Sequence, residues 1–338
     1  MIKINLSRRF FTNTERVILE TEQFKVTVKR YETGIESLTL ANSCGFVEVL
    51  PYFGQIIWNA EFHGHSLRMK NMFSRPQPAA EISDTYGCFA FHSGLLSAGC
   101  PAPEDTHPLH GEFPTSKMDS AWLEVSEKSI RIVSSYEYVR GFGNHYRALP
   151  SVRLNADSSL FDIEMRVENL SAYAPMPLQY MCHMNYAFVE NGIMTQSLPK
   201  GAFKLRSTVP AHVTPTERWT EINRRIVAGE IDADSLACAR EFDPEIVFFA
   251  DGLCRYGEKA EFRLKAPDGI TFFTSFSTKD FPVATRWILF NPDQQVAAFV
   301  LPGTCRPEGF LAARKAGTLI MLKPGEVREF SVRTGVEE

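Results

Sequence analysis

Two of the eight histidines lie in a loop whose composition suits the binding of a polar ligand. The segment 100–114 (CPAPEDTHPLHGEFP) contains His107, His110 and Glu112 together with four prolines and one glycine. Prolines restrict the backbone, and a stiff, irregular loop can hold polar side chains in fixed positions for a ligand. The alternative interpretation is a proline-rich surface loop that carries a few solvated charges.

A second segment, 178–188, is an almost continuous apolar strand that contains His183 and Asn185. Residues two apart on a strand point to the same face of a sheet, so these polar side chains are expected to share one face. Burying polar groups costs free energy unless partners or a ligand satisfy them. The pair therefore indicates a binding site, and the alternative is a core histidine bonded to a neighbouring carbonyl group.

The spacing of the histidines also raises the question of a metal site. His63 and His65 form one close pair, and His107 and His110 form another. Pro108 argues against a helix that would place the second pair on one face, and no third ligand lies nearby in sequence. We therefore expect no metal site. The seven cysteines are widely spaced without a CxxC motif, which favours free thiols in a reducing cytoplasm.

A third segment, 299–309, reads as a strand followed by a turn-rich stretch with Arg306 and Glu308. Such a stretch can present polar side chains to a cleft.

The elements that position these segments are predicted to be mostly strands. Alternating apolar residues, or runs of β-branched and aromatic residues, predict strands at 24–30, 121–125, 130–138, 152–154, 161–167, 202–205, 246–249, 260–264, 271–276, 297–301, 318–322 and 329–332. Helical periodicity is limited to a stretch within 216–239 and a shorter one at 310–315. The segment 73–81 reads as a long surface loop. So many strands need two stacked sheets, so we predict one all-β sandwich domain spanning 1–338.

Composition and charge narrow the classes of partner. The chain has 36 Lys and Arg against 40 Asp and Glu, with no basic cluster of the kind that binds nucleic acid. No apolar stretch is long enough to span a bilayer, and the first residues lack the apolar core of a secretory signal. We therefore expect a cytoplasmic protein, monomeric or homodimeric, whose ligand is a small neutral molecule.

Taken in order, the three segments resemble motifs of the galactose mutarotase-like superfamily, the aldose 1-epimerases, in a divergent bacterial branch. Residues 108–111 (PLHG), 182–186 (CHMNY) and 302–309 (PGTCRPEG) carry the resemblance, which covers the chain from about Leu50 onward. It implies a large antiparallel β-supersandwich with few short helices. It also implies exchange of the α and β anomers of a free monosaccharide without metal or cofactor, with a deoxy sugar as one candidate substrate.

The resemblance further implies roles for individual residues. Ring opening and closure need a general base on the anomeric hydroxyl and a general acid on the ring oxygen. By resemblance His183 is the acid, and His110 donates a hydrogen bond to the sugar. The glutamate that acts as base in the family is replaced here by Leu301, which cannot accept a proton. Glu308 is the first candidate to replace it, and Glu112 is the second.

Further candidates for binding sugar hydroxyls are Gln55, which stands near the place of a family arginine, and His107, Asn185, Arg306 and Asp251. Trp287 can offer a ring face to a sugar, although an aromatic residue in a strand is more often part of the core. A mutarotase is the first functional hypothesis. A non-catalytic carbohydrate-binding or sensing protein is the alternative, favoured by Leu301, and a lyase or isomerase of sugar acids is a more distant option.

Overall fold

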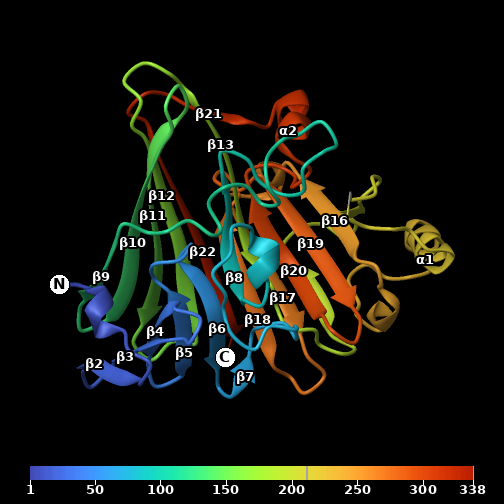
Figure 1. Ribbon diagram of the computed structural model, residues 1–338. Coiled ribbons are helices and arrows are strands. Elements are labelled where there is room, and N and C mark those ends of the chain that lie inside the picture. Colours follow the sequence, from blue (N-terminus) through green and yellow to red (C-terminus); the bar gives the residue numbers. More distant parts are fainter. Residues whose placement is uncertain (211, 338) are drawn as a thin grey trace.

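Two antiparallel sheets packed on each other make up most of the computed structural model, which describes residues 1–210 and 212–337 (Figure 1). The first sheet has nine strands, in the spatial order β1 (Ile2–Asn5), β9 (Ser120–Val125), β10 (Ser129–Val139), β11 (His145–Asn155), β12 (Leu160–Asn169), β22 (Val327–Glu337), β18 (Thr271–Ser277), β17 (Lys259–Lys265) and β14 (Ile193–Gln196). The last strand along the chain, β22, thus lies in the middle of this sheet.

The second sheet has thirteen strands and carries the segments singled out above. Its order is β15 (Lys204–Leu205), β16 (Ile246–Asp251), β19 (Val283–Phe290), β20 (Gln295–Gly303), β13 (Met176–Met184), β8 (Ala90–Leu95), β6 (Ile56–Phe62), β5 (Gly45–Leu50), β4 (Glu36–Ala41), β3 (Lys25–Arg30) and β2 (Arg16–Glu20), with β21 (Ile320–Leu322) beside β13 and β7 (His65–Ser66) beside β6. Strand β13, which contains His183, lies between β8 and β20.

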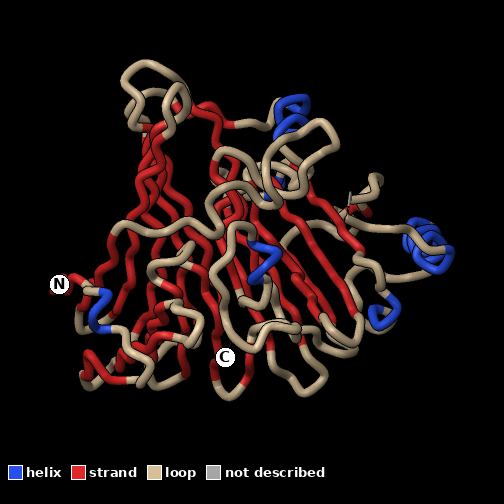
Figure 2. Tube along the Cα trace, viewed as in Figure 1, coloured by secondary structure: helices blue, strands red, loops and turns tan. Residues whose placement is uncertain are grey.

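Helices contribute little to the fold, as the trace in Figure 2 shows. In the described parts of the chain they are α1 (Glu217–Val227), α2 (Phe310–Ala316) and the 3-10 turns η1 (Arg8–Phe10), η2 (Ile82–Thr85), η3 (Ala239–Glu241) and η4 (Leu253–Tyr256). None of these helices has the length and apolar character needed to cross a membrane. The Thr216 hydroxyl caps α1 by accepting a hydrogen bond from the backbone of Trp219.

Aromatic side chains from both sheets meet in the core between them. Phe161 of β12 packs against Phe62 of β6, with ring centroids 5.7 Å apart, and against Phe89 at 6.2 Å. The Tyr186 hydroxyl reaches across the core to the Thr334 hydroxyl of β22 at 2.5 Å. Each fully buried large apolar side chain stabilises the fold by ~1.5–3 kcal/mol, so these contacts hold the sheets in one fixed arrangement.

The sequence-based prediction of an antiparallel β-sandwich with few short helices is confirmed. Both predicted helices are present as α1 and α2, and 73–81 is a loop. The structure adds strands that the sequence pattern did not indicate, among them β8. This strand is buried at every position, so its sequence does not alternate as that of a half-buried strand does.

Candidate active site

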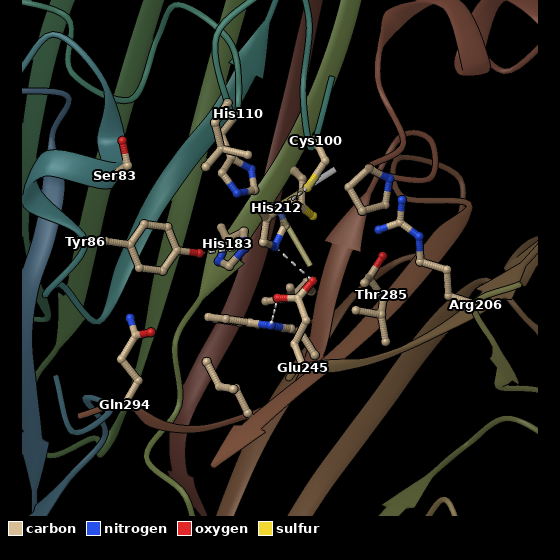
Figure 3. A pocket seen from close by; sticks show the side chains of 17 residues that line it. Ser83, Tyr86, Cys100, His110, His183, Arg206, His212, Glu245, Thr285 and Gln294 are labelled. Atoms are coloured by element: carbon tan, nitrogen blue, oxygen red, sulfur yellow. Dashed lines mark hydrogen bonds and ion pairs between the residues drawn. The ribbon is translucent and has the colours of Figure 1, made fainter. Parts of the chain in front are cut away.

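A cavity of about 320 Å³ lies over one face of the thirteen-stranded sheet (Figure 3). Its floor comes from neighbouring strands β16, β19, β20 and β13, through Val247, Trp287, Thr285, Leu301, Met181 and His183. Loops supply the walls, including Tyr86, Cys100, His110, Arg206, His212 and Glu245. A volume of this size, with mostly apolar walls and a few converging polar groups, is typical of a small-molecule site.

His183 reaches the cavity because of its place in the register of β13. It pairs with Phe91 of β8, and its ring stacks on the Phe91 ring with centroids 4.5 Å apart. Its Nε2 atom lies 3.3 Å from the Tyr86 hydroxyl, whereas its Nδ1 atom has no partner among the described residues. The preceding pair in the ladder, Cys182 and His92, points to the opposite face and is buried in the core.

His110 stands beside His183, with ring centroids 4.7 Å apart and the ring planes nearly perpendicular. Its backbone adopts φ +64°, a left-handed conformation that is costly for a residue with a side chain. Gly111 follows with φ +83°, and a Cβ atom there would lie 2.0 Å from the Ser97 carbonyl oxygen. The Ser93 hydroxyl, 3.0 Å from His110 Nδ1, fixes the orientation of the ring.

Glu245 is the carboxylate of the cavity, and in Figure 3 it lies on the other side of His183 from Tyr86. Trp287 Nε1 donates a hydrogen bond to its Oε2 atom at 2.6 Å, and His212 Nε2 lies 3.2 Å from Oε1. The other ring nitrogen of His212 lies 3.9 Å from Cys100 Sγ. A thiol, an imidazole and a carboxylate therefore form a continuous chain of contacts along the cavity wall.

The segment between β15 and β16 delivers His212 and Glu245 to the cavity and is anchored at two points. Trp219 of α1 donates through Nε1 to the Glu245 carbonyl oxygen at 3.0 Å. Arg286 of β19, which is almost fully buried, donates to the Ala233 carbonyl and to the Asp234 carboxylate at 2.6 and 2.8 Å. Because β19 also carries Trp287, the buried arginine ties this segment to the strand that orients the Glu245 carboxylate.

The environment separates the proton affinities of the cavity histidines. Burial lowers the pKa of His183 to about 3, an effect that neighbouring Asn185 opposes. Burial, followed by the nearby His183, lowers the pKa of His110 well below its ordinary value. Hydrogen bonding to Cys100 first, and to Glu245 second, raises the pKa of His212 to about 10. At neutral pH the first two rings are uncharged and His212 is a cation.

Several residues expected from the sequence to touch a ligand are buried away from the cavity. Gln55 is fully buried and donates to the Ser134 hydroxyl at 3.1 Å. Asn185 is also fully buried and donates to the Cys88 carbonyl oxygen at 3.0 Å. Neither side chain lines the cavity, so each supports the fold in this structure and the expectation that it binds a sugar hydroxyl has no geometric support.

Two members of the loop 100–114 likewise support the fold. The His107 ring receives the backbone N–H of Phe310 at the start of α2, at 3.3 Å, and its Nδ1 atom donates to the Pro108 carbonyl. The Glu112 carboxylate accepts the backbone N–H groups of Leu95 and Leu96 at 3.0 Å. Neither side chain lines the cavity, in contrast to His110 of the same loop.

Arg306, Asp251 and Glu308 lie together outside the cavity lining. Arg306 pairs with both carboxylate oxygens of Asp251, at 2.9 and 2.5 Å. Glu308 accepts a hydrogen bond from the Thr208 hydroxyl at 2.8 Å and lies 3.5 Å from Arg206, which does line the cavity. Glu308 is thus placed to hold Arg206, while the sequence-based hypothesis that it is the base finds no geometric support.

Sequence reasoning missed Glu245, His212, Cys100 and Tyr86 as members of one site. Their only local signal is that Glu245 immediately precedes a predicted strand and that Cys100 opens the proline-rich loop.

The described residues contain no group of three or more potential ligands arranged to hold a metal ion.

Comparison with known proteins bears on the fold. No protein-family model and no curated sequence matches the chain. A Klebsiella pneumoniae structure, whose assignment as an aldose 1-epimerase is itself provisional, aligns over 96% of this chain and 87% of its own, with a TM-score of 0.73 and 17% identity. A galactose mutarotase-like protein from Clostridium acetobutylicum aligns over 94% and 100%, with a TM-score of 0.63 and 13% identity.

A galactose mutarotase-like protein from Lactobacillus casei aligns over 89% of this chain and 100% of its own, with a TM-score of 0.57 and 13% identity. Identities this low establish the fold and leave the activity open. The chain has the galactose mutarotase-like fold, and the resemblance seen in its sequence is confirmed at that level.

Proposed function

We propose that this chain, with its galactose mutarotase-like fold, is an aldose 1-epimerase that exchanges the α and β anomers of a small neutral sugar. One observation carries the proposal: the His110 and His183 rings, 4.7 Å apart, share a single cavity with the Glu245 carboxylate. Anomer exchange needs proton transfer at two oxygen atoms of one sugar, the anomeric hydroxyl oxygen and the ring oxygen. This cavity holds titratable groups on more than one side.

The direction of the first proton transfers follows from the charges. His183 is uncharged at neutral pH because burial lowers its pKa to about 3, so it offers a lone pair to the anomeric hydroxyl. His212 is protonated and paired with Glu245, so this pair holds a proton for the ring oxygen. When the surroundings lower the pKa of one group and raise the pKa of another, the first group is the base and the second is the acid. The resemblance alone would give His183 the acid's role at this step.

The catalytic cycle then balances without a metal or cofactor. His183 removes the proton of the anomeric hydroxyl while the His212–Glu245 pair protonates the ring oxygen, which opens the ring to the aldehyde. After rotation about the first carbon–carbon bond, the ring hydroxyl attacks the other carbonyl face. His183 returns its proton to the carbonyl oxygen, and the His212–Glu245 pair takes one back from the ring hydroxyl.

Glu245 compensates for the leucine that stands where the family carries its glutamate. Leu301 of β20 lines the cavity and pairs with Thr285 of β19, while Glu245 directly precedes β16, the strand on the other side of β19. The Glu245 carboxylate therefore enters the same cavity from the start of β16, which is separated from β20 by one strand, β19. Trp287, between them, holds it through the 2.6 Å hydrogen bond.

The apolar walls favour a substrate with few hydroxyl groups, and we propose a deoxy sugar. Met181, Val247, Leu289 and Leu301 all line the cavity and offer no hydrogen bond. A hydroxyl group placed against such a wall loses its water without gaining a partner, at a cost of roughly 1–3 kcal/mol. His110, oriented by Ser93, is the donor that we assign to a sugar hydroxyl or to the ring oxygen.

The test is the rate of anomer exchange, measured by saturation-transfer NMR and polarimetry on freshly dissolved hexoses, pentoses and their deoxy forms. Acceleration by the wild-type protein, absent in His183→Ala, supports the proposal. Binding of a sugar without acceleration would refute it in favour of a non-catalytic carbohydrate-binding protein, the function that Leu301 favours. If no sugar of the panel binds and the exchange of none is accelerated, both functions are excluded.

A further inference from the structure

Cys100 places a thiol in the cavity wall. The anomer exchange proposed above does not involve this thiol. His212 bridges Cys100 and Glu245 through its two ring nitrogens, with Nδ1 3.9 Å from the sulfur and Nε2 3.2 Å from the carboxylate. A nucleophile contacting a base that is oriented by a third, acidic group is the arrangement of cysteine and serine hydrolases. In structures without a substrate the contact between nucleophile and base is often long.

The backbone around Cys100 is held rigidly in front of the cavity. The Cys100 N–H donates to the Pro307 carbonyl at 3.0 Å, and Gly99 forms a β-bridge with Glu308. Gly99 has φ +76°, and a Cβ atom there would lie 2.4 Å from Pro307. The thiol therefore has a fixed position relative to His212, as a nucleophile requires.

The other cysteines in the described residues lack this environment. Cys88 and Cys182 are buried, and burial raises the pKa of each thiol to about 12, which disfavours the reactive thiolate. Cys305 is also buried, Cys44 is partly buried, and Cys238 and Cys254 are exposed. None of these four lines the cavity. Cys100 alone among them combines access to the cavity with a neighbouring imidazole, so its chemistry can be compared with theirs in the same molecule.

The cavity also holds a group that suits a carbonyl substrate of this thiol. Arg206, on the same cavity wall, is a cation that can stabilise negative charge developing on a bound carbonyl oxygen.

We propose that Cys100, His212 and Glu245 form a catalytic triad that hydrolyses small, neutral carboxylic esters or lactones through an acyl-cysteine. The mostly apolar lining favours an uncharged substrate, and water is the only co-reactant. This activity goes beyond anomer exchange: it shares His212 and Glu245 with the proton transfers proposed above, but it also needs Cys100, which has no part in them.

Hydrolysis of an ester begins at the thiol. With the thiol proton on His212, the Cys100 sulfur attacks the carbonyl carbon, and the C=O electron pair moves onto the oxygen. When that pair returns, the bond to the alcohol oxygen breaks, and His212 gives this oxygen its proton. Water then attacks the thioester carbon while His212 takes one proton from it, and that proton passes to the sulfur as the carbon–sulfur bond breaks.

The experiment uses the full chain with p-nitrophenyl acetate and, in a second arm, δ-valerolactone, at neutral pH. We expect acetylation of Cys100, located by peptide mass spectrometry, to be at least about 100-fold faster than that of Cys238. We also expect p-nitrophenol release to continue beyond one equivalent per chain and to vanish in Cys100→Ala. His212→Gln and Glu245→Gln should slow acetylation of Cys100, the former by about 100-fold or more.

Three results would overturn the proposal: acetylation of Cys100 no faster than of Cys238, an unchanged rate in folded His212→Gln, or acetylation that stops at one equivalent without turnover. The comparison between two cysteines of the wild-type chain needs no variant, so a variant that fails to fold leaves the question decidable. Circular dichroism of each variant shows whether the β-sandwich has formed.

Discussion

The imidazole rings of His110 and His183 lie nearly perpendicular to each other, with centroids 4.7 Å apart, in the lining of one cavity. One comes from a proline-rich loop and the other from a central strand. Because burial lowers the pKa of both, the two rings can lie this close without mutual repulsion at neutral pH. Four predictions follow from this pair and its surroundings.

The first prediction concerns His183 itself. Replacing His183 with alanine should lower the rate of catalysed anomer exchange by about 10²–10⁴-fold, because the proton acceptor of the ring-opening step is lost. The rate is measured by saturation-transfer NMR. His107→Ala is the matched control, since His107 lies in the loop with His110 but contacts the start of α2, and its rate should stay within about threefold. Equal losses in both variants would contradict the assignment.

The second prediction decides between two carboxylates. Glu245→Gln should slow anomer exchange by about 100-fold or more, whereas Glu308→Gln should slow it by less than about 10-fold. Glu245 lines the cavity, and Glu308 acts on it only through Arg206. Both substitutions preserve side-chain shape, so steady-state polarimetry on the two variants compares charge alone. A larger effect of Glu308→Gln would restore Glu308 as the base expected from the sequence.

The third prediction concerns stability as a function of pH. His92, His110 and His183 have pKa values lowered by burial, whereas in the unfolded chain each titrates near 6.5. Below about pH 6.5 the unfolded state binds protons that the folded state does not, so the free energy of unfolding falls as pH falls. Each such histidine contributes a slope of up to ~1.4 kcal/mol per pH unit.

Urea unfolding at pH 7.5 and 5.5 measures this slope, and His92→Gln supplies the comparison. His92 lies in the core beside Tyr180 and outside the cavity lining. Its replacement should therefore remove the contribution of one histidine to the dependence of the unfolding free energy on pH. An identical slope in the variant would mean that His92 is protonated in the folded protein. His212 acts in the opposite sense: its raised pKa means that its contribution to stability is present below about pH 6.5 and is lost as pH rises through about 10.

The fourth prediction concerns the turn that carries His110. Gly111→Ala should lower the free energy of unfolding by at least about 2 kcal/mol, because a left-handed backbone is strained for alanine and the new Cβ atom meets the Ser97 carbonyl. Gly201→Ala is the matched control: Gly201 has φ +76°, but the space around it is open, so only the backbone cost of about 1–2 kcal/mol applies. Chemical denaturation of both variants separates the cost of backbone strain from the cost of the contact with Ser97. Equal losses of unfolding free energy would show that the Ser97 carbonyl moves aside without cost.

The fold was largely predictable from the sequence because half-buried strands leave an alternating pattern. Strands β3, β9, β10 and β17 were expected close to their observed bounds. Strand β8, which is covered on both faces, shows no alternation and was missed. The structure brings the His183 and His110 rings together in one cavity, and both residues had a local signal: a polar residue in an apolar strand and a histidine in a stiff loop.

The rest of the site was not predictable because it depends on which strands become neighbours. Glu245 enters the cavity only because β16 pairs with β19, and its contact with His212 requires the excursion around α1 to fold back. Conversely, the burial of Gln55 and Asn185 follows from packing that a local pattern does not reveal. Trp287, which sequence reasoning favoured as a core residue, lines the cavity and orients Glu245.

The central position of β22 has a consequence for how the protein is made. During translation, β12 and β18 are synthesised before the strand that lies between them, so the nine-stranded sheet cannot be completed until residues 327–337 have emerged from the ribosome. Thr334, which bonds to Tyr186 across the core, belongs to this last strand. A premature stop codon shortly before Val327 would spare every residue of the cavity lining and still remove the strand that joins β12 to β18, with the core residues Phe330, Val332 and Val336.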